Sequence, residues 1–100
     1  MARPRKGRCI RSKPNAVYFK PRGVPLVDLE ELTVTLDEFE AVRLADYEGL
    51  YQEDGAKRMK ISRATFGRTL ADAHRKIAEC LVKGKALRIE IARQKEEERS

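Results

Sequence analysis

The chain has no tryptophan, one histidine and two cysteines among its 100 residues. Cys9 and Cys80 lie far apart without a Cys-x-x-Cys pair, and His74 is the only imidazole. These ligand types and spacings predict neither a disulfide framework nor a zinc site. Cys80 falls on an apolar helical face, where we expect a buried thiol. We therefore expect no metal and no cofactor.

Long apolar runs are also missing. No stretch approaches the roughly 20 apolar residues of a membrane span, and the basic N-terminus is not followed by the apolar segment of a signal peptide. We therefore expect a cytoplasmic protein without a membrane partner. The chain also lacks a Gly-rich phosphate loop and a nucleophile beside a base, so we do not expect an enzyme.

Charge is abundant and is sorted into blocks within a net charge of +6. Residues 1–27 carry eight Lys and Arg and no acid, residues 28–54 carry ten acids and one cation, and residues 55–88 carry ten cations and two acids. This segregation suits a protein with one surface turned toward a polyanion and another turned away from it.

A chain of this length supports one folded domain. We divide it into a basic N-terminal arm over 1–14, a domain over 15–91 and a charged tail over 92–100. The arm is too poor in apolar residues to order alone, so it either remains a solvated tail or contacts phosphates or a minor groove. The second basic block downstream favours nucleic-acid contact through the cations Arg3, Arg5, Lys6 and Arg8.

A helix is predicted to begin at Leu36. Thr35 and Glu38 have the spacing of a capping box, in which each side chain accepts a hydrogen bond from the other residue's backbone N–H. Val34 and Phe39 occupy the two positions of a hydrophobic staple. These local signals fix the start of the first long helix.

This helix is expected to run over about 36–48, because Gly49 can adopt the left-handed conformation that ends a helix. Arg43 and Asp46 are three residues apart and are expected to pair with each other or with a neighbouring element. The expected buried side consists of Leu36, Phe39, Val42, Leu44 and Tyr47.

Residues 52–70 carry the pattern around which the rest is arranged, two helices joined by a turn of about three residues, as in a helix-turn-helix. The first helix is expected over about 52–59 and the second over about 63–82. Ala56 is small where the two helices cross, and Ser62 can cap the second helix. The expected buried face of the second helix consists of Phe66, Thr69, Leu70, Ala73, Ile77, Cys80 and Leu81.

The start of the second helix combines cations, a hydroxyl and very small residues, which lets it approach a nucleic acid closely. A helix that only needed solubility would more often carry mixed Glu and Lys there. We expect this end to enter the major groove first, with base edges facing Arg63, Ala64, Thr65, Gly67 and Arg68.

The predicted contacts divide into those that read bases and those that bind phosphates. An arginine can bind a guanine through two hydrogen bonds, which are worth about 1–3 kcal/mol of discrimination, and Thr65 or Ala64 can contact a thymine methyl group. Phosphate contacts position a protein without specifying sequence. We expect them from Gln52, Lys60, Ser62 and Arg75.

Two short strands complete the expected domain. The segment 16–20 lies between Pro14 and Pro21, which limits it to an edge strand. Its aromatic residues are more typical of a core than of base stacking. Residues 86–91 alternate as a half-buried strand that must pair, either with 16–20 or with the same strand of a second subunit. Residues 26–32 are expected to be extended or to form one helical turn.

Six segments of the chain resemble a small prokaryotic family of uncharacterised proteins that are predicted to bind DNA. They are Arg-Pro-Arg-Lys at 3–6, Tyr-Phe-Lys-Pro-Arg-Gly-Val-Pro at 18–25, Leu-Asp-Glu-Phe-Glu-Ala-Val-Arg-Leu at 36–44, Asp-Tyr-Glu-Gly-Leu-Tyr-Gln-Glu at 46–53, Ile-Ser-Arg-Ala-Thr-Phe-Gly-Arg at 61–68 and Gly-Lys-Ala-Leu-Arg-Ile-Glu at 84–90. The helical part is also similar to region 4 of bacterial sigma factors.

The resemblance implies a mainly α, three-helix helix-turn-helix domain with short strands at both ends. It also implies a sequence-specific binder of double-stranded DNA and a transcriptional regulator. Two residues depart from the pattern. Lys60 stands where the turn usually has Gly, at a cost of about 1 kcal/mol, and Gly55 stands where the helix usually has Ala, at a similar cost.

Two other functions fit the same residues. Sigma-like helical domains also dock on RNA polymerase, and the acidic segment 28–54 offers a docking surface for such a protein contact. RNA binding is equally compatible with the basic arm. For the DNA-binding function we expect a homodimer, whose recognition helices would lie about 34 Å apart.

Overall fold

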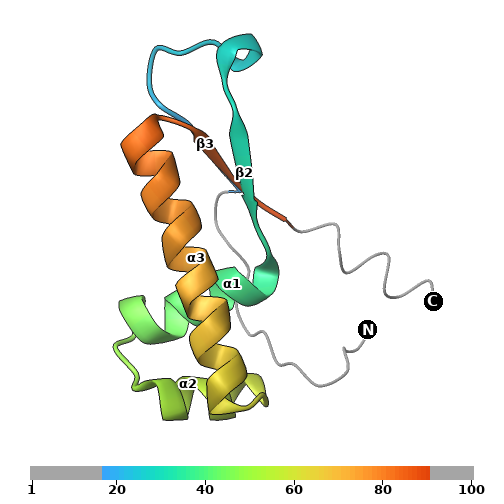
Figure 1. Cartoon of the computed structure of the whole chain (residues 1–100), viewed down its shortest axis with the longest axis vertical. Helices are drawn as coiled ribbons and strands as arrows, with labels where there is room; N and C mark the ends of the chain where they lie inside the picture. The colour runs from blue at the N-terminus through green and yellow to red at the C-terminus, as the bar shows by residue number, and fades with distance from the viewer. Residues whose placement is uncertain (1–16, 91–100) are drawn as a thin grey trace, which may run out of the picture.

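The computed structural model describes residues 17–90 (Figure 1). The arm over 1–14, with its four predicted contact residues, and the tail over 92–100 lie outside the described residues. The elements are β1 (Tyr18–Phe19), the 3₁₀ turn η1 (Leu26–Asp28), β2 (Glu31–Val34), α1 (Leu36–Val42), the π-helical turn η2 (Arg43–Tyr47), α2 (Gln52–Met59), α3 (Arg63–Lys83) and β3 (Ala86–Ile89).

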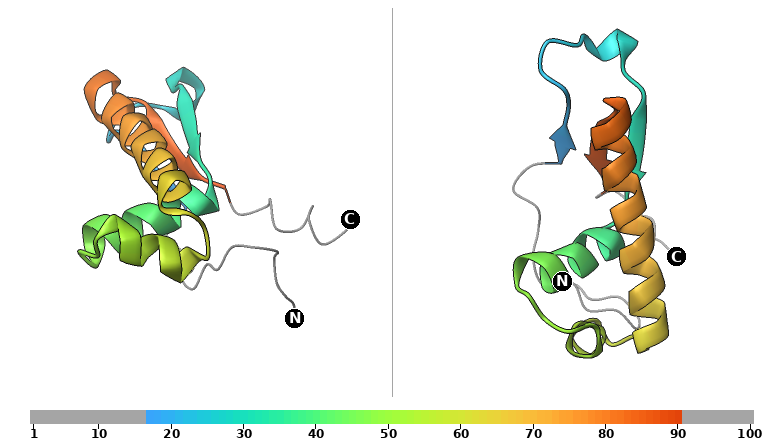
Figure 2. Two further views of the ribbon diagram at one scale, coloured as in Figure 1. Left: turned by 60° about the horizontal axis from the view of Figure 1, so that its bottom comes forward. Right: turned by 60° about the vertical axis from the view of Figure 1, so that its left-hand side comes forward.

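The longest element, α3, runs the length of the molecule. It packs on α1 and α2 at its N-terminal end and on the sheet at its C-terminal end (Figures 1 and 2). The result is a mostly helical small domain of three helices and a three-stranded mixed sheet. Because α3 belongs to both packed regions, it connects the sheet to the end of the molecule where α2 lies.

The C-terminal strand β3 pairs within the chain on both of its edges. It lies antiparallel to β1, with Tyr18 opposite Arg88, and parallel to β2, with Val34 opposite Ile89. Pairing with β1, in the segment 16–20, is one of the two alternatives predicted for this strand. The strand β2 was not predicted. Residues 26–32, expected to be extended or to form one turn, contain both, namely the single turn η1 and the start of the extended strand β2.

The first helix begins as predicted. The Thr35 N–H donates to the Glu38 carboxylate at 2.9 Å, and the Glu38 N–H donates to the Thr35 hydroxyl at 3.1 Å, which confirms the capping box. The helix ends one residue before the predicted Glu48. Gly49 follows with a φ of 78°, the left-handed conformation predicted for it.

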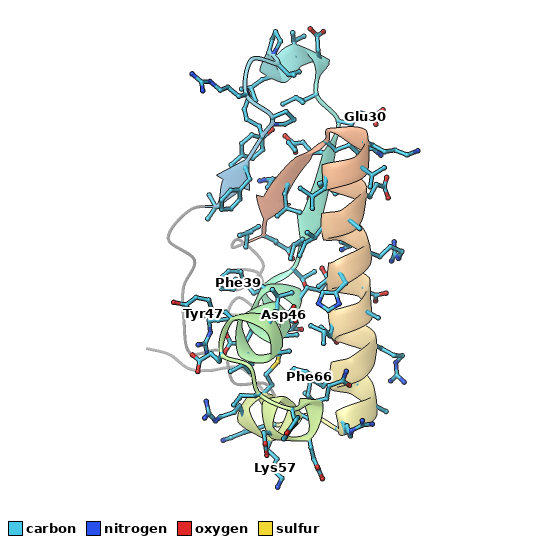
Figure 3. The ribbon with its side chains drawn as sticks, turned by 90° about the vertical axis from the view of Figure 1, so that its left-hand side faces the viewer. Glu30, Phe39, Asp46, Tyr47, Lys57 and Phe66 are labelled. Atoms are coloured by element: carbon cyan, nitrogen blue, oxygen red, sulfur yellow. The ribbon has the colours of Figure 1, made fainter. Side chains whose placement is uncertain are left out.

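Two residues that were expected to be buried lie in solvent. Tyr47 is 85% exposed and points away from the helices in Figure 3. The reason is η2, in which the Glu48 N–H donates to the Arg43 carbonyl five residues earlier. A π turn holds more residues than an α turn, which rotates Tyr47 off the buried side. Leu81 is 80% exposed because α3 turns it away from the sheet that covers Cys80.

The core around the two helix crossings is continuous. It consists of Ala41, Leu44, Ala56, Met59, Phe66 and Leu70, with Val42, Ala45, Leu50 and Ile61 packed against it. A second buried group lies between α3 and the sheet and includes Val34, Ala73, Cys80 and Ile89. The N-terminal half of α3 is therefore held by helices and its C-terminal half by strands.

Candidate functional site

The turn between α2 and α3 has a defined hydrogen-bond pattern. Lys60 ends α2 with a φ of 61° and a ψ of 43°, in the left-handed region. Its N–H donates to the Lys57 carbonyl at 3.1 Å, and the Ile61 N–H donates to the Ala56 carbonyl at 3.0 Å. This is a Schellman motif, completed by the partly buried Ile61 side chain. The expectation of a left-handed non-glycine residue in the turn is confirmed.

Replacing Lys60 with glycine is expected to raise the free energy of unfolding by about 0.5–1 kcal/mol. Glycine removes the left-handed strain of about 1–2 kcal/mol but loses part of that gain through the larger entropy of the unfolded chain. Urea denaturation of both proteins measures the difference. Lys60→Ala keeps the strain and serves as the control, because it also removes the charge. An equal effect of both substitutions would contradict this account.

Ser62 fixes the start of α3. Its hydroxyl accepts from the Thr65 N–H at 3.0 Å, as predicted for a cap, and it also donates to the Thr65 hydroxyl oxygen at 2.9 Å. Thr65 in turn lies 3.5 Å from the Arg68 guanidinium. The hydroxyls of Ser62 and Thr65 are thus engaged with each other, and Arg68 lies at the end of this chain of polar contacts.

Phe66 holds α2 and α3 together. Its side chain is fully buried, and a Cβ atom built at Gly55 would lie 2.5 Å from its Cζ atom. Figure 3 shows Phe66 on α3 directed toward α2. The penalty predicted for Gly55 from helix propensity is therefore joined by a packing role that was not predicted, because the ring occupies the space that a methyl group would need.

A second glycine, Gly67, lies close to a side chain of α2 on the outside of the same crossing. A Cβ atom at Gly67 would lie 3.1 Å from the side-chain oxygen of Gln52. The Gln52 side-chain oxygen therefore lies beside α3 at Gly67, where there is no side chain to displace it. Gln52 was predicted as a phosphate contact, and its proximity to α3 was not foreseen.

The five predicted base contacts do not share one face of α3. At about 100° per residue, Ala64, Gly67 and Arg68 lie on one side, whereas Arg63 and Thr65 are about 200° apart around the axis. Arg63, Ala64 and Arg68 are exposed, and Thr65 and Gly67 are half-buried. The outward group nearest the N-terminal end is thus Ala64, Gly67 and Arg68, with Arg63 and Thr65 on its flanks.

The predicted phosphate contacts are spread more widely. Lys60 is exposed at the turn, whereas Arg75 lies about 18 Å along α3 from Arg63. Arg75 is also 3.4 Å from the Asp72 carboxylate on the same face. The structure therefore places Lys60 with the exposed end of α3 and separates Arg75 from it.

Two exposed cations of α2 were not assigned a role from the sequence. Lys57 and Arg58 face solvent beside the turn and line a surface hollow of ≈ 350 Å³ with Leu50 and Asp54. No acid occurs between residues 55 and 71, so the surface around the turn is basic, and the exposed acids of α2, Glu53 and Asp54, lie in its first turn. In the sequence, only the excess of cations over residues 55–88 pointed to Lys57 and Arg58. The exposed cations of this region are Lys57, Arg58, Lys60, Arg63 and Arg68.

The acidic segment 28–54 is largely engaged inside the protein. Glu40 is 1% exposed and forms an ion pair of 2.8 Å with Arg43, which also pairs with Glu48 at 2.6 Å. The hydrogen bond to Glu40 raises the pKa of Arg43. Asp46 pairs with His74 of α3 at 2.6 Å, the neighbouring-element alternative of its predicted pairing. These contacts leave fewer free carboxylates for a docking surface than the sequence suggests.

Cys80 is buried as expected, and burial raises the pKa of its thiol. Within residues 17–90, no group of three His, Cys, Asp or Glu side chains is arranged to hold a metal ion. In the same part of the chain, no helix has both the length and the apolar character needed to cross a membrane.

Comparison with known proteins identifies the family. The family described as "Protein of unknown function DUF134" matches residues 1–96. The chain belongs to DUF134. UPF0251 protein TTE1845 of Caldanaerobacter subterraneus subsp. tengcongensis is 56% identical over 90 residues, which cover 90% of this chain and 76% of the relative. A UPF0251 protein of Methanosarcina acetivorans is 52% identical over 87 residues, which cover 87% and 78%. No solved structure was found to match.

The resemblance to an uncharacterised family is thereby confirmed for this DUF134 protein. The family extends over the described domain and also over most of the two ends that lie outside it. DNA binding, the sigma-like motif and the partners stay predictions, because neither the family description nor the names of these relatives states an activity.

Proposed function

We propose that this DUF134 protein binds double-stranded DNA sequence-specifically and regulates transcription. In this proposal α2 and α3 form a helix-turn-helix similar to region 4 of sigma factors, and the N-terminal end of α3 enters the major groove. The N-terminal arm over 1–14 contacts the backbone or the minor groove.

The observation that carries the proposal is the exposed, basic and rigidly held start of α3. Three contacts fix this end, namely the left-handed turn at Lys60, the Ser62 cap and the burial of Phe66 against Gly55. Arg63 and Arg68 then project into solvent from a helix that carries no acid in its first turn. A positive helix N-terminus surrounded by cations attracts phosphates and needs no rearrangement to approach them.

The outward group suggests how bases would be read. Ala64 can contact a thymine methyl group, and the Arg68 guanidinium can bind a guanine through two hydrogen bonds, whereas Gly67 is half-buried with the Gln52 amide beside it. Thr65 lies at 3.5 Å from Arg68, so its hydroxyl can restrict the rotamers of that side chain. We assign phosphate contacts to Gln52, Lys60 and Ser62, and we add Lys57 and Arg58 to the predicted set.

Replacing Arg68 with alanine is expected to lower the affinity for the selected duplex by about 5- to 150-fold, which corresponds to the 1–3 kcal/mol of one bidentate base contact. The affinity for random duplex should fall only slightly, because a single cation among many is removed. Fluorescence anisotropy at fixed salt measures both, on a target obtained by selecting bound duplexes from a random library.

Arg22 provides the control, because it is an exposed arginine in the turn before η1, at the opposite end of the molecule from α2 (Figure 1). Arg22→Ala should leave both affinities within about twofold, since a distant surface charge contributes little. Equal losses on selected and random duplex for Arg68→Ala would rule out base readout by this residue.

The two alternative functions have separate tests. Titration of duplex and single-stranded RNA and DNA at fixed salt distinguishes an RNA-binding protein, which would prefer unpaired bases that can be splayed out. A docking module would retain its polymerase partner in a pull-down after nuclease treatment. The contacts of Glu40 and Glu48 with Arg43, and of Asp46 with His74, engage three carboxylates of the acidic segment within the chain, which favours DNA binding over docking through that segment.

A further inference from the structure

The C-terminal half of α3 has an exposed apolar strip that the proposed DNA contacts do not use. Leu81 and Val82 are 80% and 81% exposed, and Ala71 and Ala78 on the same side are exposed too. This side faces away from the residues of α3 that pack on the helices and the sheet. Figures 1 and 2 show that this half of the helix extends beyond α1 and α2.

The charges along one flank of this strip alternate in sign. They occur in the order Asp72, Arg75, Glu79 and Lys83, with spacings of three or four residues that keep them on one side of the helix. Asp72 and Arg75 are more than half exposed, and their mutual contact of 3.4 Å is long. Glu79 has a closer partner, Lys85, at 2.5 Å.

We propose that this face binds a second copy of the chain, as an antiparallel pair of α3 helices with a twofold axis near residue 77. An antiparallel pairing about that point places each residue opposite the one at the mirrored distance from residue 77. Arg75 then faces Glu79 of the second copy, since both lie two residues from the axis, and Asp72 lies within one residue, or about 1.5 Å, of the position opposite Lys83. The apolar strip is matched to the same precision, because Val82 lies within one residue of the position opposite Ala71 of the second copy.

The self-complementary order of the charges identifies a second copy as the occupant. A closed dimer with twofold symmetry requires one patch to be complementary to itself. A parallel pairing in register would place like charges beside each other and would be repelled. In the antiparallel arrangement each of the four flanking charges lies within one residue of a charge of the opposite sign, and the apolar strip supplies the buried contact.

The spacing of this dimer agrees with DNA binding, and this step alone rests on the proposed function. Position 66, the middle of the predicted reading positions, is eleven residues from the axis, or about 17 Å at the rise of an α-helix. The two ends of the dimer would therefore lie about 33 Å apart. This separation is close to the one-turn spacing of half-sites on a duplex, about 34–36 Å.

Sedimentation equilibrium of the full chain without DNA tests the proposal through a charge exchange. Asp72→Lys and Lys83→Asp each place like charges opposite each other, so each should raise the dimer dissociation constant about tenfold or more. The double variant D72K/K83D restores the opposite signs across the axis and should dimerise within about threefold of the natural chain. A double variant weaker than both single variants would overturn the proposed pairing.

A second pair of variants tests the apolar strip. Val82→Lys should abolish dimerisation, whereas Val27→Lys, at a valine of η1 that is 88% exposed, should leave it unchanged. Both sites lie in solvent, so circular dichroism should show both variants folded. A chain that is monomeric up to several hundred micromolar, or one disrupted by the change at Val27 alone, would overturn the proposal.

The measurement is independent of DNA, so the two proposals can fail separately. A dimer that binds no duplex would reject the proposed function and retain the α3 pairing. A monomer that binds a specific duplex would reject the α3 pairing and retain the proposed function. A dimer unaffected by Val82→Lys would show that the copies meet elsewhere and would likewise overturn the pairing.

Discussion

Replacing Phe66 with alanine is expected to lower the free energy of unfolding by about 3–5 kcal/mol, the range for removing a buried aromatic ring. The ring is fully buried among Leu44, Ala56, Met59 and Leu70, and it fills the crossing of α2 and α3. Since small domains have a total stability of about 5–15 kcal/mol, the variant should lose a large part of its stability. Urea denaturation followed by circular dichroism measures the change.

The partner of Phe66 gives a sharper test, because two physical effects predict opposite signs. Helix propensity predicts that Gly55→Ala stabilises α2 by about 1 kcal/mol. The lack of space at Gly55 predicts the reverse. The new methyl group would lie 2.5 Å from a ring atom of Phe66, and the ring is fully buried, so it has no free space into which to move. Overpacking of a core costs about 1–3 kcal/mol. We therefore expect net destabilisation.

A double-mutant cycle separates the two effects. In a Phe66→Leu background the shorter side chain leaves room for the methyl group, so Gly55→Ala should become neutral or stabilising there. The coupling between the two positions should be on the order of 1–3 kcal/mol, as found for residues in direct contact. Stabilisation by Gly55→Ala in the natural chain would show that the ring can move aside and would contradict the close packing.

The helices could be predicted closely from the sequence because their ends carry local signals. The second helix has its predicted bounds, 52–59, and α3 runs over 63–83 against the predicted 63–82. Ser62 and Gly84 mark the ends of α3, and the capping box marks the start of α1. Each of these signals involves residues within one turn of each other, so no knowledge of tertiary packing was needed.

The missed features depend on residues that are distant in sequence. β2 is a strand because β3, more than fifty residues later, provides its hydrogen-bonding partner. The role of Gly55 depends on a ring eleven residues away, across the turn. The π turn that exposes Tyr47 leaves no periodic signal, because it interrupts the period on which the prediction rests.

The same division holds for the candidate site, where local features were predictable and contacts between distant residues were not. Capping and spacing were sufficient to place Arg63 and Arg68 on the exposed start of α3. The position of Gln52 over Gly67 and the internal pairing of the acidic segment follow only from the way the elements pack. The residue classes at the site could thus be read from the sequence, and their partners could not.

Lys76→Ala is expected to have the second largest effect, a loss of about 2–3 kcal/mol of unfolding free energy. The Lys76 ammonium group donates to the Glu38 carboxylate at 2.9 Å and to the Thr33 carbonyl at 2.8 Å. Glu38 is only 7% exposed, and removing one member of a buried ion pair leaves the other charge poorly compensated. The estimate is below the full range for buried pairs because the Lys76 side chain is 24% exposed.

The same lysine also covers the free edge of the sheet. β2 is an outer strand of the sheet. The carbonyl of Glu30, just before it, accepts a hydrogen bond from the Ala86 N–H of β3, and the Val34 carbonyl accepts one from the N–H of Glu90, just after β3. Carbonyls alternate along a strand, so the Thr33 carbonyl points to the open side, where Lys76 binds it. Removing Lys76 exposes this edge, and exposed edges promote pairing between molecules. We therefore expect Lys76→Ala to increase aggregation on heating as well.

Arg75 supplies a matched control for both readouts. It is the adjacent cation on α3, and its side chain is 66% exposed with a single long contact to Asp72. Arg75→Ala removes the same charge and should change the unfolding free energy by no more than about 0.5 kcal/mol, as expected for an exposed ion pair. Equal losses in both variants would mean that net charge, and not the link between α3, α1 and β2, determines the effect. A difference of about 2 kcal/mol between them would instead show that Lys76 holds α3 in place against β2 and α1.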